Sequence, residues 1–222
     1  MILFPGIYME IFAPHVELIA VTHQAEKIIE EAGRTCYLSF DRMTENSAAD
    51  FIPKAVARGH LSILEHASAT FRIRGGSRAF THQLVRHRVA SFSQQSQRYV
   101  KEDEFDFIIP PSIAAHAEAL EEFRACMENC RESYAKLRAM NVLKEDARFV
   151  LPNAIESEIV FTSNFREFRH LFEIRLEPHA QWEIRRICME MLLILQKEAP
   201  SVFADFEIVD REKWIARVKG GN

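Results

Sequence analysis

One stretch of the chain lacks acidic residues and carries the groups most able to do chemistry. Between Glu65 and Glu102 there is no Asp or Glu, although the whole protein has a net charge of −4. The cations and histidines of this basic segment are Arg72, Arg74, Arg78, Arg86, Arg88, Arg98, Lys101, His66, His82 and His87. So many cations without nearby carboxylates need either water or anionic ligands. We therefore expect the basic segment to bind an anion.

The centre of the basic segment, residues 86–99, joins cations to uncharged hydrogen-bonding groups. Arg86-His87-Arg88 is followed by a row of Ser and Gln side chains. Guanidinium groups bind phosphate or carbonyl oxygens in pairs of hydrogen bonds, each worth roughly 1.5–3 kcal/mol. If a helix precedes this point, Gln83, Arg86 and His87 share one face near its C-terminus. The pattern favours a small, anionic, hydrogen-bonding ligand over a merely solvated surface.

Composition excludes several classes of protein and of binding site. The 222 residues are 48% hydrophobic and include 17 Phe, which is enough for a buried core. No apolar run is long enough to cross a membrane and the N-terminal segment lacks a basic leader, so we expect a cytoplasmic protein. The glycines form neither G-x-G-x-x-G nor a P-loop. The four cysteines form no C-x-x-C pair, which predicts reduced, packed thiols and no metal site.

Periodicity predicts one α+β domain over residues 1–222, with a small, mostly antiparallel sheet surrounded by helices. Strands are expected at 16–22, 67–74 and 157–162, with Gly75-Gly76 turning the chain after the second. Helices are expected at 24–34, 47–58, 77–87, 111–140, 164–176 and from 178 to about 199. Asn164 with Glu167 three residues later is typical of a helix N-terminus.

Arg86-His87-Arg88, seven further residues and then Ser96 resemble the R-H-R-x7-S signature of the flavin-dependent thymidylate synthases. Other segments resemble family positions in the same order, over roughly residues 16–210: Gly59-His60, Glu65-His66, Gln83, Arg148, Asn164-Phe165-Arg166, His170, Arg175 and His179–Glu183. The resemblance implies conversion of dUMP to dTMP, with 5,10-methylenetetrahydrofolate as carbon donor and FAD reduced by NADPH. It also implies a homotetramer whose subunits share active sites.

The resemblance implies two groups of site residues. Those matching nucleotide-binding positions are Gln83, Gln94, Ser96, Gln97, Arg98, Arg148 and Arg175. Those matching positions around the flavin are His60, Ser62, Glu65, Arg86, His87, Arg88, Asn164, Arg166 and His170. The sequence departs from some family members at Gln94, His170 and Cys36, where Glu, Asn and Ser occur in others.

No cysteine lies in the signature, so we expect activation of uracil without a thiolate. Arg175 is the expected catalytic residue, stabilising negative charge on the ring, while Arg98 and Arg148 hold the phosphate. Ser96 is expected to donate or accept hydrogen bonds, not to act as nucleophile.

The sequence also allows other interpretations of several residues. His60 could cap a helix end, and Arg166 with His170 could form an exposed helix face. His66 is expected to be a structural residue inside a strand, and Cys126 with Cys130 to be packing residues. The basic segment with Phe92 and Tyr99 could instead bind RNA or single-stranded DNA, and a relative that keeps flavin but has lost methyl transfer is a third possibility.

Overall fold

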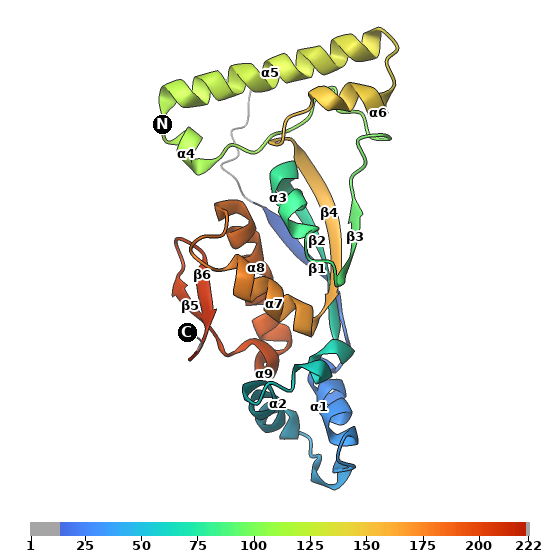
Figure 1. The fold of residues 1–222 in the computed structure, drawn as a ribbon, viewed down its shortest axis with the longest axis vertical. Coiled ribbons are helices and arrows are strands. Elements are labelled where there is room, and N and C mark those ends of the chain that lie inside the picture. The colour runs from blue at the N-terminus through green and yellow to red at the C-terminus, as the bar shows by residue number, and fades with distance from the viewer. Residues whose placement is uncertain (1–13, 221–222) are drawn as a thin grey trace. The chain divides into compact units, whose positions relative to one another are not determined.

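The structure, a computed structural model, describes residues 14–220 (Figure 1). The strands are β1 (His15–Val21), β2 (Ser68–Ser77), β3 (Ala90–Gln94), β4 (Glu156–Asn164), β5 (Phe206–Asp210) and β6 (Ile215–Val218). The helices are α1 (Ala25–Thr35), α2 (Ser47–Ala57), α3 (Arg78–Leu84), α4 (Pro111–Ala114), α5 (Ala117–Ala139), α6 (Lys144–Ala147), α7 (Phe165–Arg175), α8 (Trp182–Glu198) and α9 (Pro200–Phe203). Short 3-10 helices are η1 (Phe40–Arg42), η2 (Leu61–His66) and η3 (Arg148–Val150). The N-terminal segment, for which we expected no leader, lies outside the described residues.

The chain divides into two compact units. The α5 unit holds residues 14–15, Arg74–Thr81 and Gln94–Glu158, and the α7 unit holds Val16–Ile73, His82–Ser93 and residues 159–220. Strands β2 and β4 each run from one unit into the other. The single domain expected from the sequence stays a prediction.

One sheet has the strand order β1-β2-β4-β3. The hydroxyl groups of Thr70 in β2 and Thr162 in β4 lie 2.9 Å apart, and the N–H of Gly75 donates to the Glu156 carboxylate at 2.9 Å. Partner numbers therefore fall along β4 as they rise along β2, so these strands are antiparallel. A separate antiparallel hairpin joins β5 to β6. The expected mixture of helices with a small antiparallel sheet is confirmed.

Phenylalanine rings form the core of the α7 unit. Phe168 is fully buried, and its ring centroid lies 5.6 Å from that of Phe71, 5.2 Å from that of Phe161 and 5.9 Å from that of Phe172. Phe172 in turn contacts Phe203 edge to face. These rings hold one face of α7 against β2, β4 and α9, because each buries a large apolar area.

In the α5 unit, the long helix α5 carries Arg131, whose guanidinium lies over the rings of Phe105 and Phe107. The Arg131 guanidinium also donates to the Phe105 carbonyl. The cation therefore has both a hydrogen-bond acceptor and aromatic rings as neighbours. No helix within residues 14–220 has the length and apolar character needed to cross a membrane.

Several predicted boundaries are wrong. Strand β2 continues through Gly75-Gly76 to Ser77 instead of turning, with Gly75 at φ 72°. Helix α3 is capped by Ser77 as expected but ends at Leu84, three residues early. Helix α8 begins at Trp182 with Gln181 as its cap, not at Pro178, and the long helix predicted at 111–140 is broken between α4 and α5. His66 ends η2 instead of lying inside a strand.

Candidate active site

Helix α7 carries several of the predicted site residues. The Asn164 side chain accepts a hydrogen bond from the N–H of Glu167 at 2.9 Å, which confirms the predicted helix start. The buried Phe rings fix one face of the helix, while Arg166 and His170 lie exposed on another. Arg175, half-buried, is its last residue.

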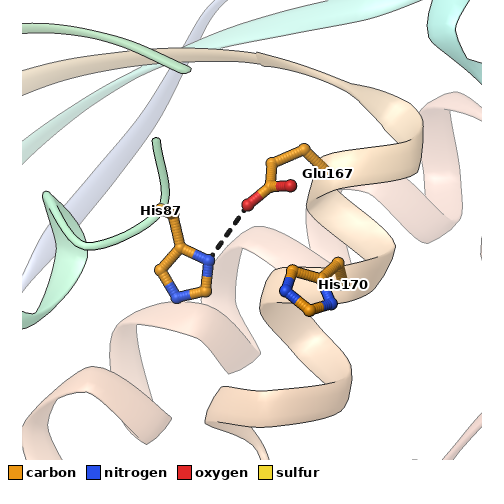
Figure 2. Close-up of side chains that lie close together, drawn as sticks. All are labelled: His87, Glu167 and His170. Atoms are coloured by element: carbon orange, nitrogen blue, oxygen red, sulfur yellow. Dashed lines mark hydrogen bonds and ion pairs between the residues drawn. The ribbon is translucent and has the colours of Figure 1, made fainter. Parts of the chain in front are cut away.

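His87 lies in the α7 unit between the two ends of this helix. Its Nδ1 is 3.1 Å from a carboxylate oxygen of Glu167, as Figure 2 shows, and its Nε2 is 3.1 Å from Nε of Arg175. Arg175 also donates from Nη2 to the Gln83 carbonyl at 3.4 Å. The exposed His170 ring lies beside this group, with its centroid 6.0 Å from that of His87. The structure thus brings together His87, His170, Arg175 and Gln83 from the predicted sets.

Burial lowers the pKa of His87 below its ordinary value, because only 6% of the residue is exposed and the charged imidazolium is disfavoured there. The hydrogen bond and charge of Glu167 raise this pKa, while the Arg175 cation and His170 lower it. The net shift is downward, so His87 is neutral at pH 7 and one ring nitrogen keeps a lone pair.

The remaining predicted flavin residues of this unit are exposed. His60 and Ser62 lie at the start of η2, and Glu65 at its end forms an ion pair with Arg166. Arg86 lies in the hydrogen-bonded turn that ends α3, and Arg88 lies two residues farther on, so the helix predicted to reach His87 ends before Arg86. Within residues 14–220, neither Arg86 nor Arg88 forms a side-chain ion pair. These exposed, chemically suitable donors fit a phosphate-bearing cofactor.

The predicted nucleotide residues Gln94 to Arg98 lie in the α5 unit. Gln94 donates from its amide nitrogen to Thr81 at 2.9 Å and to Ser157 at 3.0 Å, which leaves its oxygen as an acceptor. The Ser96 hydroxyl accepts from the N–H of Arg98 at 3.3 Å, so it shapes the turn. Gln97 is buried.

Glu145 brings Arg98 and Arg148 together. Its carboxylate lies 3.0 Å from the Arg98 guanidinium, and its carbonyl accepts from Nε of Arg148 at 3.1 Å. Burial lowers the pKa of Arg78, and the Arg148 charge lowers it further, so these two side chains are close enough to interact. Sequence reasoning missed Glu145 and did not separate Arg78 from the rest of the basic segment. The α5 unit therefore presents a cluster of guanidinium groups suited to a phosphate dianion.

The predicted site residues fall into two sets, one in each unit. Gln94, Ser96, Gln97, Arg98 and Arg148 belong to the α5 unit, and Arg175 with Gln83 belongs to the α7 unit.

Two of the four cysteine thiols, those of Cys188 and Cys130, are poorly suited to nucleophilic attack. Cys188 is completely buried, and this burial raises its pKa far above the ordinary thiol value. Burial and the neighbouring Cys126 raise the pKa of Cys130. Both thiols therefore stay protonated at neutral pH.

Comparison with known proteins decides the family. Residues 17–201 match the family model described as thymidylate synthase complementing protein. The chain is 46% identical over 198 residues to a flavin-dependent thymidylate synthase of Geobacter sulfurreducens, covering 86% of this chain and 85% of that protein. The chain belongs to this family. The assignment makes it an enzyme and sets aside the nucleic-acid-binding alternative.

Other relatives carry the same name. A flavin-dependent thymidylate synthase of Nitratidesulfovibrio vulgaris is 43% identical over 211 residues, which cover 86% of each protein. One from Pyrococcus furiosus is 46% identical over 158 residues, covering 69% of this chain and 65% of that protein. The family resemblance found in the R-H-R-x7-S signature is therefore confirmed.

Proposed function

We propose that this member of the family converts dUMP to dTMP with 5,10-methylenetetrahydrofolate as carbon donor and FAD, reduced by NADPH, as redox carrier. The observation that carries the proposal is the contact of both Arg98 and Arg148 with Glu145, because guanidinium groups that meet at one residue suit a nucleotide phosphate. The relatives named flavin-dependent thymidylate synthase support the reaction.

In the proposed reaction the uracil C5 gains a methyl group and loses its proton, tetrahydrofolate leaves, and NADPH is oxidised to NADP⁺. FAD, once reduced by NADPH, would supply the two electrons that turn the transferred methylene into a methyl group. Arg98 and Arg148 bind the phosphate, while Gln83, Gln94, Ser96 and Gln97 orient the nucleotide by hydrogen bonds. Arg175 donates to the pyrimidine and stabilises the negative charge that develops on it.

The residues proposed to hold FAD are His60, Ser62, Glu65, Arg86, His87, Arg88, Asn164, Arg166 and His170. The exposed Arg86 and Arg88 guanidinium groups fit its pyrophosphate. Asn164 retains its amide nitrogen as a donor, since its oxygen caps α7. We further propose a cytoplasmic homotetramer with active sites shared between subunits.

Spectroscopy and turnover test the proposal directly. Purified protein should be yellow or take up FAD, should oxidise NADPH in response to dUMP, and should form dTMP only when methylenetetrahydrofolate is present. A colourless protein that binds neither FAD nor dUMP would refute the proposal. Flavin binding without any dTMP would identify a relative that has lost methyl transfer.

The substrate assignment has its own test. Replacing Arg98, Arg148 or Arg175 by Ala should weaken dUMP binding or turnover by at least tenfold while FAD stays bound, because each change removes charged hydrogen bonds worth roughly 1.5–3 kcal/mol each. Steady-state kinetics with varied dUMP, together with flavin absorbance, measure both effects. Unchanged dUMP kinetics in all three variants would contradict the assignment.

A further inference from the structure

A chain of hydrogen bonds connects the first turn of α7 with its last residue through His87. Glu167, in the first turn, lies 3.1 Å from Nδ1 of His87, and Nε2 of the same ring lies 3.1 Å from Nε of Arg175. Glu167 and His87 are almost buried, with 9% and 6% exposed. Two residues near opposite ends of α7 therefore contact one imidazole ring.

The direction of these two hydrogen bonds fixes the tautomer of His87. The Nε–H of Arg175 is always a donor, so Nε2 of His87 must supply the lone pair. The single ring proton of neutral His87 then resides on Nδ1, from which it donates to Glu167. Protonated His87 would lose the acceptor for Arg175 and place two cations side by side.

The same geometry decides against a metal site in this conformation. Possible ligand atoms of His87, Glu167 and His170 all lie within 4.8 Å of one another. A metal on Nδ1 would displace the proton from Nδ1 and require it on Nε2, which would break the bond from Arg175. The existing hydrogen bonds therefore favour a role in orienting Arg175.

The guanidinium of Arg175 is held along one edge. Its Nε donates to His87 and its Nη2 to the Gln83 carbonyl, whereas its Nη1 donates to no group within residues 14–220. Because a guanidinium is planar, two fixed donors set the direction of the third. The half-buried side chain can thus present Nη1 to a ligand in a defined orientation.

We propose that Glu167 is a positioning residue that holds His87 as the Nδ1–H tautomer and thereby fixes the Arg175 guanidinium for the pyrimidine nucleotide. The inference rests on the proposed function, since it gives Arg175 its ligand. Glu167 itself contacts neither the nucleotide nor the flavin in this scheme. Its effect passes through one imidazole ring.

Two measurements on the FAD-loaded protein test this role. Nitrogen-15 spectra of labelled histidine, with His87 assigned from a His87→Gln sample, report the tautomer without any substrate. Calorimetric titration with dUMP reports the nucleotide affinity. Glu167→Ala removes the acceptor, Glu167→Gln keeps an oxygen acceptor without the charge, and Glu173→Ala changes an exposed glutamate on the same helix as a matched control.

We expect wild-type His87 to be the Nδ1–H tautomer. Glu167→Ala should move it toward Nε2–H and weaken dUMP binding about tenfold to a hundredfold, the range for a lost charged hydrogen bond. Glu167→Gln should keep the tautomer and stay within about threefold of wild-type affinity, and the Glu173→Ala control should match the wild type. Unchanged dUMP affinity in Glu167→Ala, or an Nε2–H tautomer in the wild-type protein, overturns the inference.

The two proposals fail in different ways. If the wild-type protein binds neither FAD nor dUMP, the proposed function fails, and the role of Glu167 toward a nucleotide fails with it, even if the tautomer is as expected. If wild-type dUMP binding is intact but does not respond to Glu167, only the positioning role fails. Should Glu167→Ala not fold, Glu167→Asp shortens the reach while keeping the charge, and undiminished dUMP affinity in that variant overturns the inference.

Discussion

Replacing Glu145 by Gln should tighten dUMP binding, because this carboxylate occupies the Arg98 guanidinium that we assign to the phosphate. The ion pair spans 3.0 Å, and its side chains are 53% and 44% exposed. Exposed pairs of this kind contribute about 0.2–1 kcal/mol. Releasing Arg98 from the pair should therefore lower the dissociation constant of dUMP by a factor of about 1.4 to 5.

Calorimetric titration of FAD-loaded protein with dUMP measures this gain. The gain should shrink as salt rises from about 50 to 500 mM, because salt screens exposed charges. Glu132→Gln is the matched control: it makes the same charge change in an exposed ion pair, at 3.0 Å from Lys136, and should show less gain. If Glu145→Gln weakens dUMP binding or equals the control, competition between Glu145 and the phosphate for Arg98 is refuted.

Three further predictions concern sulfur, the core and pH. Replacing all four cysteines by Ala should leave dTMP formation largely intact, since none lies in the R-H-R-x7-S signature and buried Cys188 stays protonated; lost turnover in a folded variant would point to a thiolate mechanism. Phe168→Ala should lower the free energy of unfolding in urea by about 3–5 kcal/mol, because the ring is fully buried among other rings, and a loss below about 1 kcal/mol would contradict that packing. The pKa of His87 is lower in the folded protein than in the unfolded chain, so its contribution to stability is complete above about pH 6.5 and is lost as the pH falls toward the folded value. Urea unfolding from pH 7.5 to 5.5 should thus show a steeper loss for wild type than for His87→Gln, and equal slopes would exclude this linkage.

Capping residues predicted where a helix begins, because a cap acts on residues next to it in the sequence. Asn164 and Glu167 marked the start of α7, because a cap acts within one turn. The same signals failed after Ser77. Ser77 as a cap suggested a helix to about His87, but the helix ends at Leu84, and His87 contacts Glu167, 80 residues later in the sequence.

Long-range partners explain the site residues that sequence reasoning missed. Glu145 lies 47 residues from Arg98, and Glu167 was recognised only as a helix-start residue. The basic segment contains no carboxylate, and we expected its cations to meet water or anionic ligands. The fold instead supplies carboxylates from elsewhere in the chain, since Glu145 pairs with Arg98 and Glu167 bonds to His87. Gly75-Gly76 similarly suggested a turn, whereas β2 continues through both glycines to Ser77, and the N–H of Gly75 donates to the Glu156 carboxylate.

Helix α7 places buried rings and polar groups on the same stretch of about three turns. Phe165, Phe168 and Phe172 fix its rotation, and that rotation sets where Glu167 and Arg175 point. A substitution that lets the helix turn about its axis would misdirect the polar groups even if the protein stayed folded. Selection for a stable interior and selection for an active enzyme therefore act on the same segment. Its core residues and its polar residues cannot change independently of one another.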